Sequence, residues 1–147
     1  MKAIEIKTLS QEKFSNYGTI IELKRNDGSG RYFEVLVEAK SNGWRIGVMD
    51  VQRYVVPYLE RHLKSKESHE PVCGTMILLV APAEKPENIE AFLLDKPVSV
   101  DEGVWHQIMA ISDTARVKVT ENLDMPSNES ETWKLPGNLI SNIINIE

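Results

Sequence analysis

The sequence is poor in cysteine and in long apolar runs. A single cysteine, Cys73, excludes an intrachain disulfide and a metal site built from several cysteines. The longest apolar run, residues 76–81, is far too short to cross a bilayer. The first ten residues contain no long apolar stretch, so we expect no secretory signal. These features predict a protein of the reducing cytoplasm with no membrane partner.

Clustered positive charge is also lacking. Lys and Arg total 17 against 22 Asp and Glu, the net charge is −5, and no basic run occurs. Nucleic acids are bound through clustered positive charge, so we expect no nucleic-acid partner. The hydrophobic fraction of 41% is ordinary for a globular protein. A chain of 147 residues fits one domain with a sizeable core, and we expect that domain to span residues 1–147.

Short segments with strand-like patterns recur along the chain and are separated by turn-forming residues. In residues 32–39, Phe33, Val35 and Val37 fall on one face. Residues 75–81 are almost entirely apolar, as expected for a strand buried on both faces. Other expected strands lie at residues 3–9, 19–23, 44–51, 53–62, 67–74, 89–94, 98–103, 104–111 and 115–122.

Helix is minor in this pattern. Ser10 is a suitable N-cap for a helical turn over residues 11–15, and residues 139–146 suit a final strand or a short helix. About ten short strands with turn signals between them indicate an all-β antiparallel sandwich or barrel. Barrels of this size often hold a small ligand in their mouth.

Two clusters of residues carry candidate chemistry, and the first flanks residues 64–66. Glu60 and His62 are two residues apart and share one face of a strand, as do Glu67 and His69. If residues 64–66 form a turn, the two pairs lie on adjacent antiparallel strands and up to four ionisable side chains point the same way. Carboxylate and imidazole ligate zinc, manganese or iron, and they are also the usual general acid–base pair. A solvated strand edge is the alternative interpretation.

The second cluster runs from Gly103 to His106. A turn led by glycine precedes a strand that begins near Trp105 and His106. Neighbouring residues of a strand point to opposite faces, so Trp105 goes to one side and His106 to the other. His106 is either a core histidine with its ring nitrogens satisfied or an imidazole at the mouth of a barrel. We favour the second interpretation, which places His106 opposite the first cluster.

Together the two clusters resemble the two-part signature of the cupins, which are double-stranded β-barrels of jelly-roll type. There, H-x-H-x(3,4)-E supplies three metal ligands and G-x-x-H supplies the fourth. In this resemblance His62, Glu67 and His106 take three ligand positions, and Glu60 stands where the first histidine would be. The resemblance implies a divalent metal (zinc, manganese, iron or nickel), or otherwise no cofactor.

The resemblance narrows to the ureidoglycolate lyase family. The segments that carry it are LSQEKFSNYGTIIE (9–22), NDG…RY (26–32), ERH-x-x-S-x-E-x-x-x-P (60–71) and GVWHQ (103–107). This chain has Gln107 where the family has a second histidine, and Glu67 where it usually has glutamine. Family members are small cupin-like proteins, usually homodimeric. They release urea from ureidoglycolate and give glyoxylate, late in the allantoin branch of purine degradation.

The resemblance implies roles for particular residues. The expected catalytic residues are His62, Glu67 and His106. His106 or Glu67 takes the hydroxyl proton of the substrate, and His62 protonates the departing urea or ligates the metal. The substrate is a small carboxylate, which guanidinium groups bind in a two-point fork, so we expect Arg31 and Arg61 to bind it, with Arg45 and Arg53 as the other candidates. Trp105 either packs in the barrel or stacks on the ligand.

Two other classes of function stay open at this point. The same features suit a non-catalytic cupin that binds a different small acid or a sugar, as a sensor or storage module. They also suit a metal-dependent cupin isomerase or oxygenase. Turnover of ureidoglycolate, and its response to metal removal, distinguishes these from the lyase.

Overall fold

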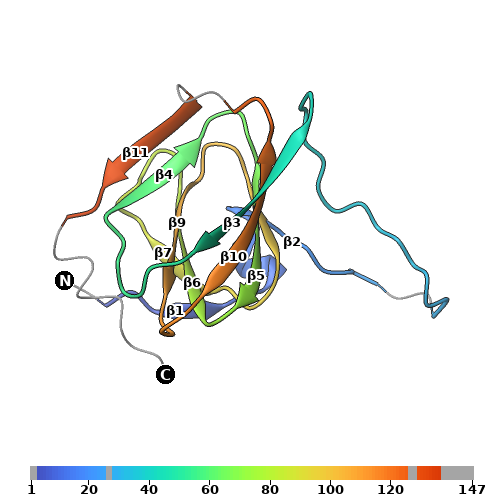
Figure 1. Ribbon diagram of the computed structural model, residues 1–147, viewed down its shortest axis with the longest axis horizontal. Coiled ribbons are helices and arrows are strands. Elements are labelled where there is room, and N and C mark those ends of the chain that lie inside the picture. Colours follow the sequence, from blue (N-terminus) through green and yellow to red (C-terminus); the bar gives the residue numbers. More distant parts are fainter. Residues whose placement is uncertain (1–2, 26–27, 126–128, 137–147) are drawn as a thin grey trace.

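The computed structural model describes residues 3–25, 28–125 and 129–136 and consists of two facing β-sheets (Figure 1). The six-stranded sheet contains, in spatial order, β1 (Ile6–Thr8), β7 (Glu90–Leu93), β6 (Met76–Ala81), β9 (Trp105–Ala110), β4 (Tyr58–His62) and β11 (Ser130–Lys134). The five-stranded sheet contains β2 (Gly18–Ile20), β8 (Val98–Val100), β5 (Glu67–Cys73), β10 (Arg116–Asn122) and β3 (Trp44–Asp50). The predicted all-β class with minor helix is confirmed.

Strand β6 shows how the chain builds two layers of core. All of its residues are buried. Leu78 and Val80 belong to the apolar cluster between the sheets, which also contains Val98 and Val117 of the five-stranded sheet. Alternate residues of β6, such as Leu79, pack into a second cluster on the outer face of the six-stranded sheet. The predicted strand buried on both faces is therefore confirmed.

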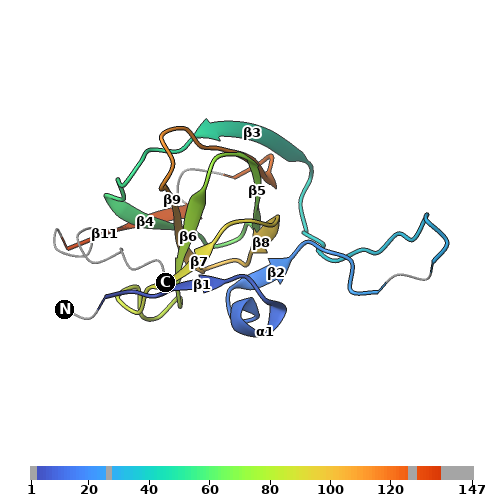
Figure 2. The same cartoon turned by 90° about the horizontal axis from the view of Figure 1, so that it is seen from below.

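A short helix closes one end of the inner core. Helix α1 (Gln11–Phe14) begins where the sequence predicts, because the Ser10 side chain accepts a hydrogen bond from the backbone N–H of Lys13. Figure 2 shows α1 beside β2. The Phe14 ring meets Phe92 of β7 edge-on, with the ring centroids 5.4 Å apart. No helix among the described residues is long and apolar enough to span a membrane.

The predicted hairpin around residues 64–66 is wrong. Strand β4 pairs with β9 and β11 in one sheet, whereas β5 pairs with β8 and β10 in the other. Residues 63–66 therefore cross from one sheet to the other. Strands β4 and β5 therefore lie in different sheets, and residues of both line one cavity between the sheets. Each strand pairs with strands that are distant in the sequence.

The predicted strand over residues 32–39 is also wrong. Residues 21–25 and 28–43, here called the arm, leave the barrel after β2 and return at β3 without forming a strand (Figures 1 and 2). Phe33 and Val35 are 83% and 59% exposed. The alternating pattern forms no ladder here, because the projecting part of the arm meets no strand of its own chain.

The C-terminal region holds a strand that the sequence pattern missed. Residues 130–134 form β11, which pairs along the whole of β4. The strand or helix predicted at residues 139–146 lies outside the described residues. The extent of a single domain over residues 1–147 therefore stays a prediction.

Replacing Gly74 with alanine is expected to lower the free energy of unfolding by about 3 kcal/mol. Gly74 turns the chain from β5 into β6 with a φ of +79°, and an added Cβ would lie 2.1 Å from the carbonyl oxygen of Thr114. Gly30→Ala is the matched control, because its φ is +70° and no heavy atom lies within 4 Å of its added Cβ. We expect it to lose only about 1 kcal/mol. Guanidinium denaturation measures both, and equal losses would contradict the backbone clash.

Candidate active site

A cavity of about 320 Å³ collects ionisable side chains from the two facing sheets. Glu60 and His62 enter it from β4, and Glu67 and His69 enter it from β5. Each pair shares a face because alternate residues of a strand point the same way. The structure thus brings the two pairs together across the barrel, with His106 of β9 between them.

Glu67 lies at the centre of the group and is contacted by three imidazoles. Its carboxylate is 2.5 Å from His62 Nε2, 2.9 Å from His69 Nε2 and 3.4 Å from His106 Nε2. Burial by itself would raise the pKa of Glu67. The close contacts with the three histidines outweigh burial and hold the pKa of Glu67 well below its ordinary range. Glu67 is therefore an ionised carboxylate inside the barrel.

His106 is held by the glycine turn that precedes it. Gly103 has a φ of +78° and donates its N–H to the carbonyl of His62 at 2.8 Å, which ties the turn to β4. His106 lies directly opposite Glu60 in the strand register. Its Nδ1 donates to the carbonyl of Val104 at 2.9 Å, so Nε2 is left facing Glu67 and the cavity.

The environment of His106 favours its protonated form. The ring is only 2% exposed, and burial would lower the pKa of the imidazole. The hydrogen bond and the negative charge of Glu67 act in the opposite direction and raise that pKa overall. His106 Nε2 can therefore accept a proton in the cavity and retain it beside Glu67.

Two contributors to the site received no role from the sequence, although His69 belongs to the first candidate cluster. His69 is 2% exposed and bonds the second carboxylate oxygen of Glu67; its two-residue spacing from Glu67 was the available signal. Ser130 of β11 lies 3.0 Å from His62 Nδ1 through its hydroxyl. Ser130 falls in a turn-rich segment, and nothing in the local pattern links it to His62.

The three residues expected to bind substrate do not line the cavity. Trp105 points to the face of β9 opposite His106, as predicted for neighbouring residues of a strand, and packs in the outer apolar cluster. Arg61 lies over the Trp105 ring and pairs with Glu131. Arg31 is exposed on the arm. The substrate-binding role of Arg61 and Trp105 gains no support from this arrangement.

The residues present fit a divalent metal. The ligand atoms of Glu60, His62, Glu67 and His106 lie within 4.8 Å of one another. Glu67 Oε2 and His106 Nε2 are buried without a well-aligned hydrogen bond, and ligation would satisfy both. Imidazole nitrogens with carboxylate oxygens suit zinc, manganese, iron or nickel.

Solved structures resemble this fold at low sequence identity. A dTDP sugar isomerase from Desulfovibrio desulfuricans matches with a TM-score of 0.57 and 16% identity over 81% of this chain and 76% of that one. The 4-keto-6-deoxy sugar epimerase NovW from Streptomyces spheroides matches with a TM-score of 0.52 and 18% identity over 64% and 52% of the two chains. These likenesses show the fold alone, and they confirm the predicted cupin-like β-barrel.

Sequence comparison is more specific. A ureidoglycolate lyase from Azotobacter vinelandii is 27% identical over 134 residues, covering 77% of this chain and 81% of its own. Residues 1–138 match the profile of the ureidoglycolate lyase family. The residues of the cavity lie within this match. The chain therefore belongs to the ureidoglycolate lyase family.

Proposed function

We propose that this protein is a lyase that releases urea from ureidoglycolate and leaves glyoxylate. Family membership over residues 1–138 supports this reaction. The observation that carries it is the ionised Glu67, buried in a cavity and contacted by three imidazoles. A non-catalytic binder has no need for such a costly group of proton-transferring side chains.

The reaction requires one proton to leave oxygen and one to reach nitrogen. The substrate carbon bears a hydroxyl group and a urea nitrogen. Loss of the hydroxyl proton forms the carbonyl of glyoxylate while the carbon–nitrogen bond breaks, and the departing nitrogen takes a proton to give urea. The two proton movements balance, so neither an oxidant nor a reductant is needed.

The structure offers a group for each proton. In its neutral form His106 presents Nε2 to the cavity, and Glu67 raises the pKa of this imidazole, so the neutral ring is the better base. Glu67 is a weak base because its own pKa is held low. His62, fixed between Ser130 and Glu67, is the acid that protonates the leaving nitrogen.

A divalent metal would be held by His62, Glu67 and His106, with Glu60 as the fourth ligand, and the two imidazoles would then serve as ligands in place of base and acid. Its chemistry would be to polarise the hydroxyl or the carboxylate of the substrate. His69 lies outside this ligand group and orients Glu67 through its second oxygen.

The cellular setting is part of the same proposal. We place the protein in the cytoplasm, as a homodimer acting late in allantoin degradation. The single cysteine supports a reducing compartment, and the exposed arm supports association with a second copy.

Purified protein incubated with ureidoglycolate is expected to release urea and glyoxylate in equal amounts. Elemental analysis of the same preparation, and the assay repeated after chelation, report whether a metal takes part. Activity that survives chelation is expected if His106 and His62 act as base and acid. Loss of activity on chelation, with recovery on adding back one divalent metal, would show that these imidazoles ligate a metal in the active enzyme. Stoichiometric metal without urea would contradict the lyase and favour a metal-dependent cupin with another substrate. Absence of both would favour a small-acid binder.

A further inference from the structure

Apart from its imidazoles, the described lining of the cavity offers no basic side chain to the carboxylate of the proposed substrate. Three carboxylates line it, those of Glu60, Glu67 and Glu121, and no lysine or arginine is among its described lining residues. Anionic substrates are bound by guanidinium or ammonium groups in most sites of this kind. If the proposed function is right, the site of one chain is therefore incomplete.

The arm carries the missing charge on a projecting tip. Arg25 and Arg31 lie on either side of residues 26–30. Arg25 Nε donates to the Tyr32 hydroxyl at 2.8 Å, and its guanidinium lies over the Tyr32 ring. The backbone N–H of Lys24 donates to Glu34 Oε2 at 3.1 Å. These contacts hold the outgoing and returning legs together, so both arginines lie at the tip, away from their own barrel (Figure 1).

The returning leg presents an apolar stripe to solvent. Phe33 and Val35 are 83% and 59% exposed and alternate with Tyr32 and Glu34, as in a strand with one buried face. Contiguous exposed apolar side chains on a small protein mark an interaction surface. The pattern is that of a strand whose partner lies outside the chain.

Strand β3 offers a matching edge. It ends the five-stranded sheet and, among the described strands, pairs with β10 alone. Trp44, Ile46 and Val48 form an outward apolar face and are 68%, 51% and 63% exposed. Met49 points the other way and lines the catalytic cavity. A strand added at this edge would extend the apolar face of β3 and lie beside the cavity.

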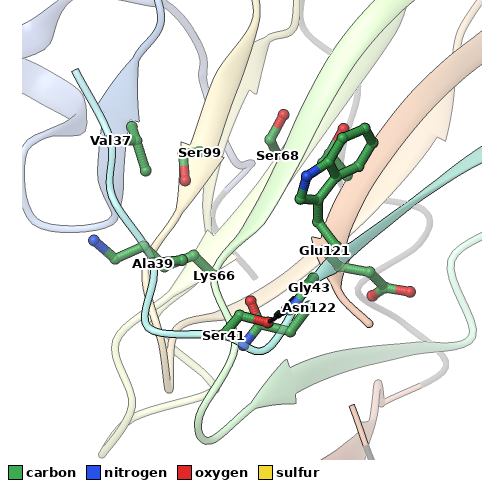
Figure 3. Close-up of a pocket in the computed structure, with 11 residues that line it drawn as sticks. Val37, Ala39, Ser41, Gly43, Lys66, Ser68, Ser99, Glu121 and Asn122 are labelled. Carbon is green, nitrogen blue, oxygen red and sulfur yellow. Dashed lines mark hydrogen bonds between the residues drawn. The ribbon is translucent and has the colours of Figure 1, made fainter. Parts of the chain in front are cut away.

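A second hollow lies where the arm meets β3. Figure 3 shows Val37, Ala39 and Ser41 of the returning leg beside Ser68 and Ser99, which lie on β5 and β8 of the five-stranded sheet. A cavity of about 280 Å³ remains between them, and Trp44 also lines it. The returning leg therefore does not pack closely against its own sheet. The hollow lies next to the apolar face of β3, because Trp44 lines both.

We propose that the arm of a second copy adds to the free edge of β3 and delivers Arg25 and Arg31 to the cavity of the first. With antiparallel addition, the tip lies at the Met49 end of β3, and Met49 lines the cavity. The exchange is reciprocal, so each site of the dimer combines the carboxylate and imidazoles of one chain with the guanidinium groups of the other. The role of the arginines rests on the proposed function, which supplies the anionic substrate. The exchange of the arms does not depend on that function.

The interface is tested by the oligomeric state. Light scattering after size-exclusion chromatography is expected to show a dimer for the full chain and a monomer for Val35→Asp. Val72→Asp is the matched control, because Val72 is 58% exposed against 59% for Val35 and lies on β5. A monomeric wild type, or a Val35→Asp protein that stays dimeric, would overturn the exchange.

The contribution to the partner's site is tested by mixing inactive variants. Arg25→Ala and Arg31→Ala are each expected to lower kcat/KM for urea release by roughly 10- to 100-fold. When Arg31→Ala is refolded in equal amounts with His106→Ala, half of the dimers are mixed and each has one intact site. Activity should then recover to about one quarter of the wild type. The same recovery is expected when Arg25→Ala replaces Arg31→Ala in the mixture with His106→Ala.

The outcomes separate the two proposals. Failure to recover activity, with both variants dimeric, would show that the arginines act in their own chain or not at all. Wild-type activity in both arginine variants would equally overturn their role. If the wild-type dimer releases no urea, the lyase reaction fails, and the Val35→Asp result alone decides whether the arm forms the interface.

Discussion

Glu67→Gln is expected to lower kcat/KM for urea release by about 1,000-fold. Glutamine has the same size but no charge, and its amide places a donor where an imidazole now donates. Glu67 raises the pKa of His106 and contacts His62 at 2.5 Å, so its neutralisation weakens the base and misplaces the acid. Steady-state assays of urea and glyoxylate measure the effect.

The control for this substitution lies on the same strand. Glu70→Gln alters a carboxylate of β5 that does not line the cavity and pairs with Lys118 at 2.9 Å. A half-exposed pair of this kind contributes little, so we expect activity within a factor of about 2 of the wild type. Circular dichroism should show both variants folded. A folded Glu67→Gln enzyme with full activity would remove Glu67 from the mechanism and leave the chemistry to the histidines.

Phe92→Ala is expected to lower the free energy of unfolding by about 4 kcal/mol. The Phe92 ring is fully buried between the sheets and contacts the rings of Phe14 and Tyr17 at centroid distances of 5.4 and 6.1 Å. Alanine leaves a cavity and removes both aromatic contacts, through which helix α1 is attached to β7. The loss combines the transfer and cavity terms of a large core side chain.

A graded variant separates the volume of Phe92 from its aromatic contacts. Phe92→Leu keeps most of the volume and should cost about 1.5 kcal/mol. Guanidinium denaturation followed by tryptophan fluorescence gives both values. Phe92 does not line the catalytic cavity, so the folded fraction of each variant should keep the wild-type KM. A loss below about 1 kcal/mol for alanine would show that the end of the barrel is loosely packed.

Several features of the site follow from the sequence, because they depend only on local backbone geometry. The two-residue period of a strand places Glu60 with His62, and Glu67 with His69, whatever the strands pair with. The same period sends Trp105 and His106 to opposite faces of β9. The glycine before that strand allows the left-handed turn observed at Gly103. The resemblance of these segments to the ureidoglycolate lyase motifs gave the family.

The pairing of strands was decided by the tertiary structure alone. Strands β4 and β5 are neighbours in the chain but lie in different sheets, because each pairs with strands far away in the sequence. No local pattern distinguishes a hairpin turn from a crossover when both are short and polar. The ionisable pairs therefore meet across the barrel, not side by side.

The surroundings of the site were likewise decided by distant contacts. Ser130 reaches His62 only because β11 pairs with β4, and Arg61 turns away from the cavity to lie over Trp105. The arm has the alternation of a strand, yet Phe33 is exposed. By itself the sequence determined which side chains share a face. The tertiary structure decided which faces meet, because pairing energy comes from contacts between segments that no local window contains.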